Sequence, residues 1–255
     1  MQTSINVPKV KTKYTDYLNN PSMNSIFLEQ VEPEYVIEVT NKLKPKLNCG
    51  YDNISTKLLK ETIHLIIKPI THIINTSLDT GIVPDRLKIA KVIPIYKNSD
   101  KSILKNYRPV SLLSAFSKIF EKIMYNKLVS FLNHNETFYK HQYGFREKHS
   151  TIHPILHLIN HCADVNNRKP KEYTLAIFCD LSKAFDVINH SILLQKLNHY
   201  GIRGVANKWF ENYLLNRKQY VQIDQSRYNL CKIDCGVPQD SILEPLLYLI
   251  YMLMI

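Results

Sequence analysis

Apolar residues recur at helical spacing along much of the chain. Between residues 54 and 78 an apolar side chain returns every three or four positions, with Pro69 inside the pattern and Gly81 after it. Residues 115–134, AFSKIFEKIMYNKLVSFLNH, give the clearest amphipathic pattern, with Lys and Glu opposite the apolar face. The residues expected on that apolar face are Ile119, Phe120, Ile123, Leu128 and Leu132. Both stretches therefore predict helices.

Three further helices are expected in the second half of the chain. One follows Ser150, because Pro154 is tolerated in the first turn of a helix. Another covers about 187–200 and is stopped by Gly201. A third lies around residues 206–216, ANKWFENYLLN.

Other stretches have the short alternating or continuous apolar patterns of strands. Residues 88–97 alternate, and Pro94 within them indicates a sheet edge or a bulge. Residues 219–224 and 228–236 resemble the two arms of a hairpin. The apolar run within 173–180 predicts a buried strand that pairs with this hairpin. Helices packed on a small antiparallel sheet make the expected fold class α+β.

The last 13 residues, LEPLLYLIYMLMI, are the most hydrophobic stretch. A membrane crossing needs roughly 20 apolar residues, and this run includes Glu244 and Pro245. It is therefore expected to be a buried helix. Because the chain ends inside this pattern without a cap, we expect a fragment of a longer protein.

The charge balance changes the picture of possible partners. Thirty-three Lys and Arg against 22 Asp and Glu give a formal charge of +11 over 255 residues, which favours a polyanion such as nucleic acid. A basic protein without such a partner is the alternative. The five cysteines form no C-x-x-C pair, and no signal peptide precedes them. An intracellular protein, of cytoplasm or nucleus, with no membrane segment is expected.

Asp180 stands directly after the apolar run 175–179. Aspartate is poor in strands and costly to bury without a partner. It either opens a loop or is a carboxylate held rigidly at the end of a strand. Asp186 precedes a helical pattern, so we expect it to be the N-cap of that helix.

Four stretches, in order, resemble the reverse transcriptase domain of non-LTR retrotransposons. They are KVIPIYKNSDKSILKNYRPVSLLSAFSKIFEKIM, HQYGFREKHST, FCDLSKAFDVINH and GVPQDSILEPLLYLIY. The likeness runs from about Cys49 to the end of the chain. It implies the fingers and palm of a right-hand polymerase, with a partly ordered lead-in at 1–48, a fingers-like region at 49–170 and a partial palm at 171–255.

The resemblance implies RNA-directed DNA synthesis from an RNA template, a DNA primer and deoxynucleoside triphosphates. Enzymes of this kind use two Mg²⁺ ions, which Mn²⁺ can replace, and such hard cations prefer carboxylate oxygens. By its place in the family motif, Asp180 is the expected catalytic metal ligand. The backbone carbonyl of Leu181 is the second expected ligand.

The same resemblance assigns nucleotide contacts. Lys97 and Arg108 match basic positions that hold the triphosphate. Phe185 matches the position that excludes a 2′-hydroxyl, and Gln239 matches a side chain near the 3′ position of the nucleotide. Arg146 either positions the template or packs the fingers.

The chain also departs from the family pattern. Glycines of the family's PQG and LGP motifs are Asp240 and Glu244 here, and acids suit neither a left-handed backbone nor a polyanion. The Asp-Asp turn that supplies the other metal carboxylates is absent from the 255 residues, as is the thumb. We therefore expect this chain alone to be inactive. The alternative is a non-enzymatic nucleic-acid-binding remnant, whereas a membrane-associated helical protein rests on the terminal run alone. The oligomeric state stays open.

Overall fold

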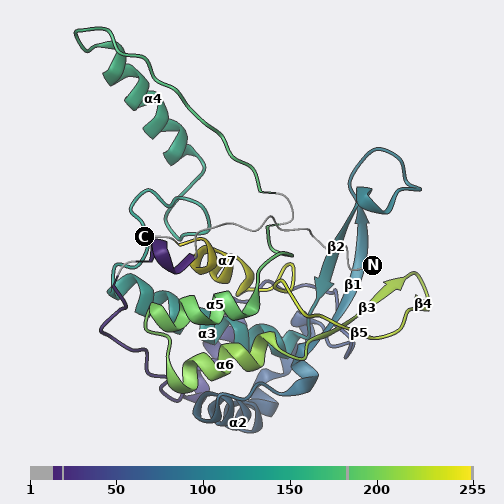
Figure 1. The fold of residues 1–255 in the computed structure, drawn as a ribbon. Coiled ribbons are helices and arrows are strands. Elements are labelled where there is room, and N and C mark those ends of the chain that lie inside the picture. The colour runs from purple at the N-terminus through teal and green to yellow at the C-terminus, as the bar shows by residue number, and fades with distance from the viewer. Residues whose placement is uncertain (1–13, 19, 182–183, 254–255) are drawn as a thin grey trace.

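The computed structural model describes residues 14–18, 20–181 and 184–253. Figure 1 shows a body of helices with a small sheet on one side. The helices are α1 (Pro33–Lys42), α2 (Thr56–Thr80), α3 (Ala115–His134), α4 (Ile152–Asn166), α5 (His190–His199), α6 (Gly204–Leu214) and α7 (Glu244–Met252). The strands are β1 (Ile89–Tyr96), β2 (Tyr107–Leu112), β3 (Lys218–Ile223), β4 (Ser226–Arg227) and β5 (Cys231–Lys232). Single 3-10 turns cover Tyr14–Tyr17, Asp85–Lys88 and Leu104–Asn106.

The sheet is mixed, which corrects the expectation of a purely antiparallel one. Its order is β2-β1-β3-β4, and β5 also pairs with β3. β1 is antiparallel to β2 but parallel to β3. A parallel pair needs a long crossover, and the chain between β2 and β3 supplies one through α3 to α6. The pairing of β1 with β3 ends at Val92, so Pro94 lies on a free edge as predicted.

The predicted helices form the core. Ser55 caps the start of α2 by accepting a hydrogen bond from the Leu58 N–H, and Gly81, at φ 69°, ends it. The five residues expected on the apolar face of 115–134 are all buried in α3. Trp209 of α6 is fully buried and donates from Nε1 to Ser77 Oγ at 3.0 Å. These contacts join α2, α3 and α6 into one scaffold.

The predicted strand at 173–180 is wrong for the described structure. Residues 171–181 are extended but form no strand, and Ile177 and Phe178 are 79% and 84% exposed. An apolar strand is stable only beside another strand, and none of the described strands pairs with this segment. Figure 1 shows α4 projecting away from the helical body, with this segment running back from its far end.

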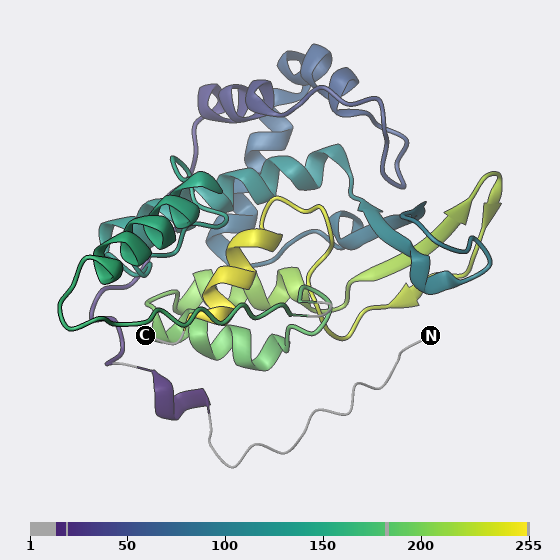
Figure 2. The ribbon, with the colours of Figure 1, turned by 90° about the horizontal axis from the view of Figure 1, so that it is seen from above.

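Helices α5 and α7 test two further predictions. The N-cap of α5 is Asn189, whose Oδ1 accepts from the Ile192 N–H at 3.1 Å, so the prediction of Asp186 as N-cap is wrong. α7 is packed into the core, as expected for the terminal apolar run, and Figure 2 shows it between α3 and α5. Within the described residues, no helix has the length and hydropathy that a bilayer crossing requires.

Candidate nucleotide-binding site

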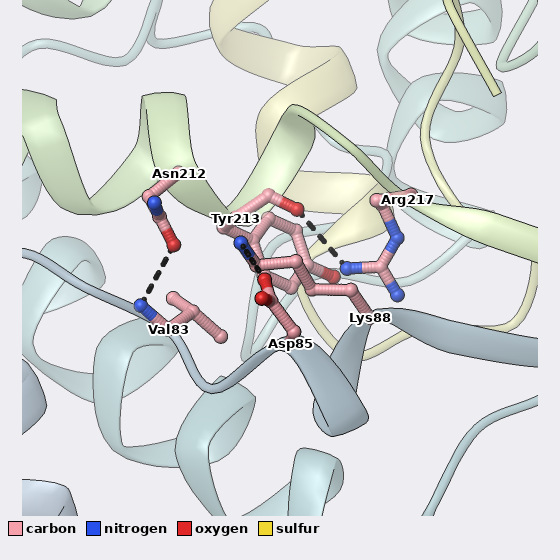
Figure 3. A network of polar contacts seen from close by, with 6 residues as sticks. All are labelled: Val83, Asp85, Lys88, Asn212, Tyr213 and Arg217. Atoms are coloured by element: carbon pink, nitrogen blue, oxygen red, sulfur yellow. Dashed lines mark hydrogen bonds and ion pairs between the residues drawn. The ribbon is translucent and has the colours of Figure 1, made fainter. Parts of the chain in front are cut away.

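The β1–β2 hairpin, which carries Lys97 and Arg108, is anchored at its base to α6. Figure 3 shows the side chain of Asn212 accepting a hydrogen bond from the Val83 N–H, at 2.8 Å. The neighbouring buried ammonium of Lys88 pairs with Asp85 at 3.1 Å. These bonds fix the chain immediately before β1.

A buried polar network continues from β3 into the helices. Arg217 is 1% exposed; its Nη1 donates to the Tyr213 carbonyl at 3.1 Å, and the guanidinium lies 4.7 Å from the Tyr213 ring centre (Figure 3). The Tyr213 hydroxyl donates to Glu121 Oε1 at 2.9 Å. Burial raises the pKa of Glu121, and hydrogen bonds and the charge of Arg217 oppose that rise. The network joins α3, α6 and the start of β3.

The loop at 236–243 is held from two sides. Glu121 Oε2 accepts the Ile242 N–H at 2.9 Å. At the other end, the Gly236 N–H donates to the Ile188 carbonyl at 2.9 Å, and His190 Nε2 bonds the Gly236 carbonyl at 2.7 Å. Gly236 has φ 78°, and a Cβ there would lie 2.9 Å from the Phe185 carbonyl oxygen. Only glycine allows so close an approach.

Phe185 lies in an aromatic cluster beside that loop. The Val237 N–H donates to the Phe185 carbonyl at 3.1 Å. The ring of Phe185 is half-buried, with its centre 4.9 Å from that of Tyr248 and 6.1 Å from that of Phe145. The position of this ring is therefore fixed by α7 and by the 137–149 loop.

Lys97 and Arg108 project from the same face of the hairpin. Arg108 is opposite Ile95, and the Lys97 N–H continues the ladder by donating to Asn106 O at 2.9 Å. In such a pair, residues two positions apart share a face. Lys97 is exposed near the hairpin tip, whereas Arg108 reaches Asp240, with 3.8 Å between Nη2 and Oδ1.

Carboxylates surround the polar end of this site. Gln239 Nε2 donates to Asp186 Oδ1 at 2.8 Å. Asp240 has φ 65°, and its N–H donates to Glu244 Oε2 at 2.5 Å. Burial raises the pKa of the Glu244 carboxyl to about 7. The backbone at Asp240 is left-handed, a conformation that glycine adopts most readily, whereas Glu244 begins α7.

The expected metal ligands do not make a complete site in the described residues. Asp180 is exposed at the end of the extended segment, and Leu181 is 51% exposed. Across the described part of the chain, no three His, Cys, Asp or Glu side chains are arranged to hold an ion. Mg²⁺ needs more oxygen ligands than one carboxylate supplies, so Asp180 and the Leu181 carbonyl would hold only part of a two-metal centre.

Arg146 makes packing contacts. Its Nη1 donates to the Tyr139 carbonyl at 3.3 Å, and its guanidinium lies 5.1 Å from the Phe138 ring centre. Two surface cavities, of about 580 and 320 Å³, are lined partly by Arg146. These contacts join the two ends of the 137–149 loop to each other.

The sequence profile described as "Reverse transcriptase (RNA-dependent DNA polymerase)" matches residues 95–255, more than half of the chain. The chain belongs to this family. The reverse transcriptase match covers β2, the aromatic cluster and the 236–243 loop, so it includes Arg108, Phe185 and Gln239.

Relatives from transposons confirm the resemblance to the reverse transcriptase domain of non-LTR elements. The chain is 30% identical over 244 residues to a "Probable RNA-directed DNA polymerase from transposon BS" of Drosophila melanogaster. It is 29% identical over 245 residues to the "RNA-directed DNA polymerase from mobile element jockey" of the same fly. Each alignment covers 92% of this chain but 26% of the relative, so the chain spans about a quarter of their length.

Sequence reasoning missed the buried supports of this site. Glu121 resembles any polar residue of an amphipathic helix, and Tyr213 and Arg217 resemble ordinary residues of a helix and a strand start. Their roles depend on contacts over 92 and 121 residues of sequence, from Glu121 to Tyr213 and to Ile242. Gly236 carried a signal, because a glycine at the end of a predicted strand marks a turn or a close backbone approach.

Proposed function

We propose that this chain provides the nucleotide-binding and nucleic-acid-binding surface of a reverse transcriptase. One observation carries the proposal: residues from three distant stretches meet in one place. Arg108 of β2 pairs with Asp240, the neighbouring Gln239 bonds Asp186, and Asp186 follows Phe185 directly. A deoxynucleoside triphosphate is the ligand whose parts match these groups.

Each residue has a distinct proposed role. The guanidinium of Arg108, with the ammonium of Lys97 on the same face, offsets the charge of the triphosphate. The ring of Phe185, fixed by Tyr248, leaves no room for a 2′-hydroxyl. Gln239 offers an amide to the nucleotide near its 3′ position.

A nucleotide titration tests this assignment. Fluorescent dATP should bind the 255-residue chain, and Arg108→Ala should weaken that binding roughly tenfold, because it removes a charge-assisted contact. Arg168→Ala is the matched control, since Arg168 is an exposed arginine beyond the end of α4. Equal affinities for the two variants would contradict the proposal.

The preference for deoxyribose over ribose provides a second test of the same site. Phe185→Ala should reduce the ratio of dATP to ATP affinity, whereas Phe27→Ala, at an exposed position before α1, should leave the ratio unchanged. An unaltered ratio of dATP to ATP affinity in Phe185→Ala would contradict the proposal that Phe185 excludes the 2′-hydroxyl.

The incomplete ligand set favours a second candidate, nucleic-acid binding without synthesis. Asp180 and the Leu181 carbonyl remain our proposed Mg²⁺ ligands, but they belong to no cluster of three or more His, Cys, Asp or Glu side chains among the described residues. We expect no primer extension by residues 1–255 on an RNA template with Mg²⁺ or Mn²⁺. Extension that disappears in Asp180→Ala would contradict this candidate and show a working metal site.

A further inference from the structure

Two of the three polar side chains assigned to the nucleotide, Arg108 and Gln239, already contact carboxylates of their own chain. Arg108 Nη2 lies 3.8 Å from Asp240 Oδ1, with the side chains 53% and 45% exposed. Gln239 Nε2 donates to Asp186 Oδ1 at 2.8 Å. Both groups thus face a negative oxygen of the kind that a phosphate would present.

Asp240 is fixed in place from its backbone outward. Its φ of 65° is a conformation that aspartate adopts more readily than most residues. Its N–H donates to Glu244 Oε2 at 2.5 Å. The charge of Asp240 also acts on Lys118 of α3. The backbone of Asp240 is therefore held in place, with its carboxylate on the side of Arg108.

The pKa of Glu244 depends on the charges of the same neighbouring residues. Burial is the largest cause of its raised pKa; Asp240 and Asp186 add to the rise, whereas the Asp240 N–H and Arg108 oppose it. The charges of Asp240, Asp186 and Arg108 therefore all act at the position of the Glu244 carboxyl. An anionic ligand that enters this field meets three acids around one arginine and one amide.

We propose that Asp240 competes with the triphosphate for Arg108, and that Asp186 competes with the sugar for Gln239, so that the two acids set the affinity of the site. The inference rests on the proposed function, because it takes these two residues as nucleotide contacts. It follows from Coulomb repulsion between the acids and the triphosphate, together with the need to break two existing contacts before the nucleotide binds. The ligand class is a nucleoside triphosphate.

Titration of fluorescent dATP into the 255-residue chain, at low ionic strength without divalent metal, tests this. Asp240→Asn keeps the shape and the tolerance of positive φ but removes the charge, so affinity should rise roughly two- to fivefold, the range of an exposed ion pair. Asp224→Asn is the matched control: Asp224 also has positive φ, at 50°, but lies in the β3–β4 turn, across the sheet from β2. It should leave the affinity unchanged.

The double variant Asp240→Asn with Arg108→Ala should lose the gain, because the freed partner is gone. Asp186→Asn should give a smaller gain of its own, and it serves as the test if Asp240→Asn does not fold. An Arg108→Ala variant that weakens binding, beside Asp240→Asn and Asp186→Asn variants that leave it unchanged, would overturn this inference and leave the proposed function standing. Affinity that never responds to Arg108→Ala would instead overturn the proposed function, and this inference with it.

Discussion

The fully buried carboxylate of Glu121 accepts the backbone N–H of Ile242 at 2.9 Å. Through its other oxygen it also accepts the hydroxyl of Tyr213 at 2.9 Å. One side chain of α3 thus connects α6 to the loop that carries Gln239. Glu121 thus positions the loop of the site from within the core.

Loss of Glu121 should cost much of the stability. Glu121→Ala removes the acceptor of three donors, the Tyr213 hydroxyl, the Ser117 hydroxyl and the Ile242 N–H, so we expect a loss of about 3 kcal/mol in the free energy of unfolding. Glu121→Gln keeps an acceptor and should cost less. Urea unfolding measures both, with Glu211→Ala on the exposed side of α6 as a control that should stay within about 0.5 kcal/mol. An unchanged free energy of unfolding in Glu121→Ala would contradict the stabilising role of Glu121.

Gly236→Ala should disrupt the contact between the 236–243 loop and Phe185. The added Cβ would lie 2.9 Å from backbone oxygen at a φ of 78°, so we expect a loss of about 2 kcal/mol or more and weaker binding of dATP. Gly144→Ala is the matched control, because its Cβ would meet only a Gln142 side-chain atom at 3.5 Å. Thermal unfolding compares the two variants; similar melting temperatures would contradict the prediction.

Glu244 should make stability depend on pH. Its pKa rises from 4.5 to about 7 in the folded chain, so the protonated form is favoured by folding. This contribution is fully present below about pH 4.5 and is lost as pH rises through 7. Glu244→Gln, which still accepts the Asp240 N–H, should flatten that decline and be more stable than the parent at pH 8.

Chemical unfolding at pH 5 and pH 8 measures the effect of Glu244. Its ionisation is coupled to Asp240, Asp186 and Arg108, all of which remain in the variant. Glu61→Gln, on an exposed position of α2, should leave the pH dependence of the parent unchanged. If stability still declines with rising pH in Glu244→Gln, another titrating group causes the decline.

Binding to an RNA–DNA hybrid should weaken steeply with salt. A formal charge of +11 implies release of counterions from the phosphates, so affinity should fall roughly tenfold or more between about 50 and 200 mM salt. Asp180→Ala removes a negative charge and should not weaken binding. Fluorescence anisotropy of a labelled hybrid measures both, and an affinity that ignores salt would refute the electrostatic account.

The sequence by itself determined the family and the described helices other than α1. Gly81 ends α2 as expected, and the apolar face of α3 matches the expected residues, because helix signals lie within a few neighbouring positions. The motifs around Arg108, Phe185 and Gln239 identified a reverse transcriptase, since each motif is a local run of residues.

Only the tertiary structure decided the partners of those residues. The parallel pairing of β1 with β3 and the bond from Asp186 to Gln239 join segments whose separation no local pattern encodes. For the same reason the apolar run before Asp180 predicted a strand, although the described structure offers it no neighbour. A strand exists through hydrogen bonds to another strand, and a helix through bonds within itself.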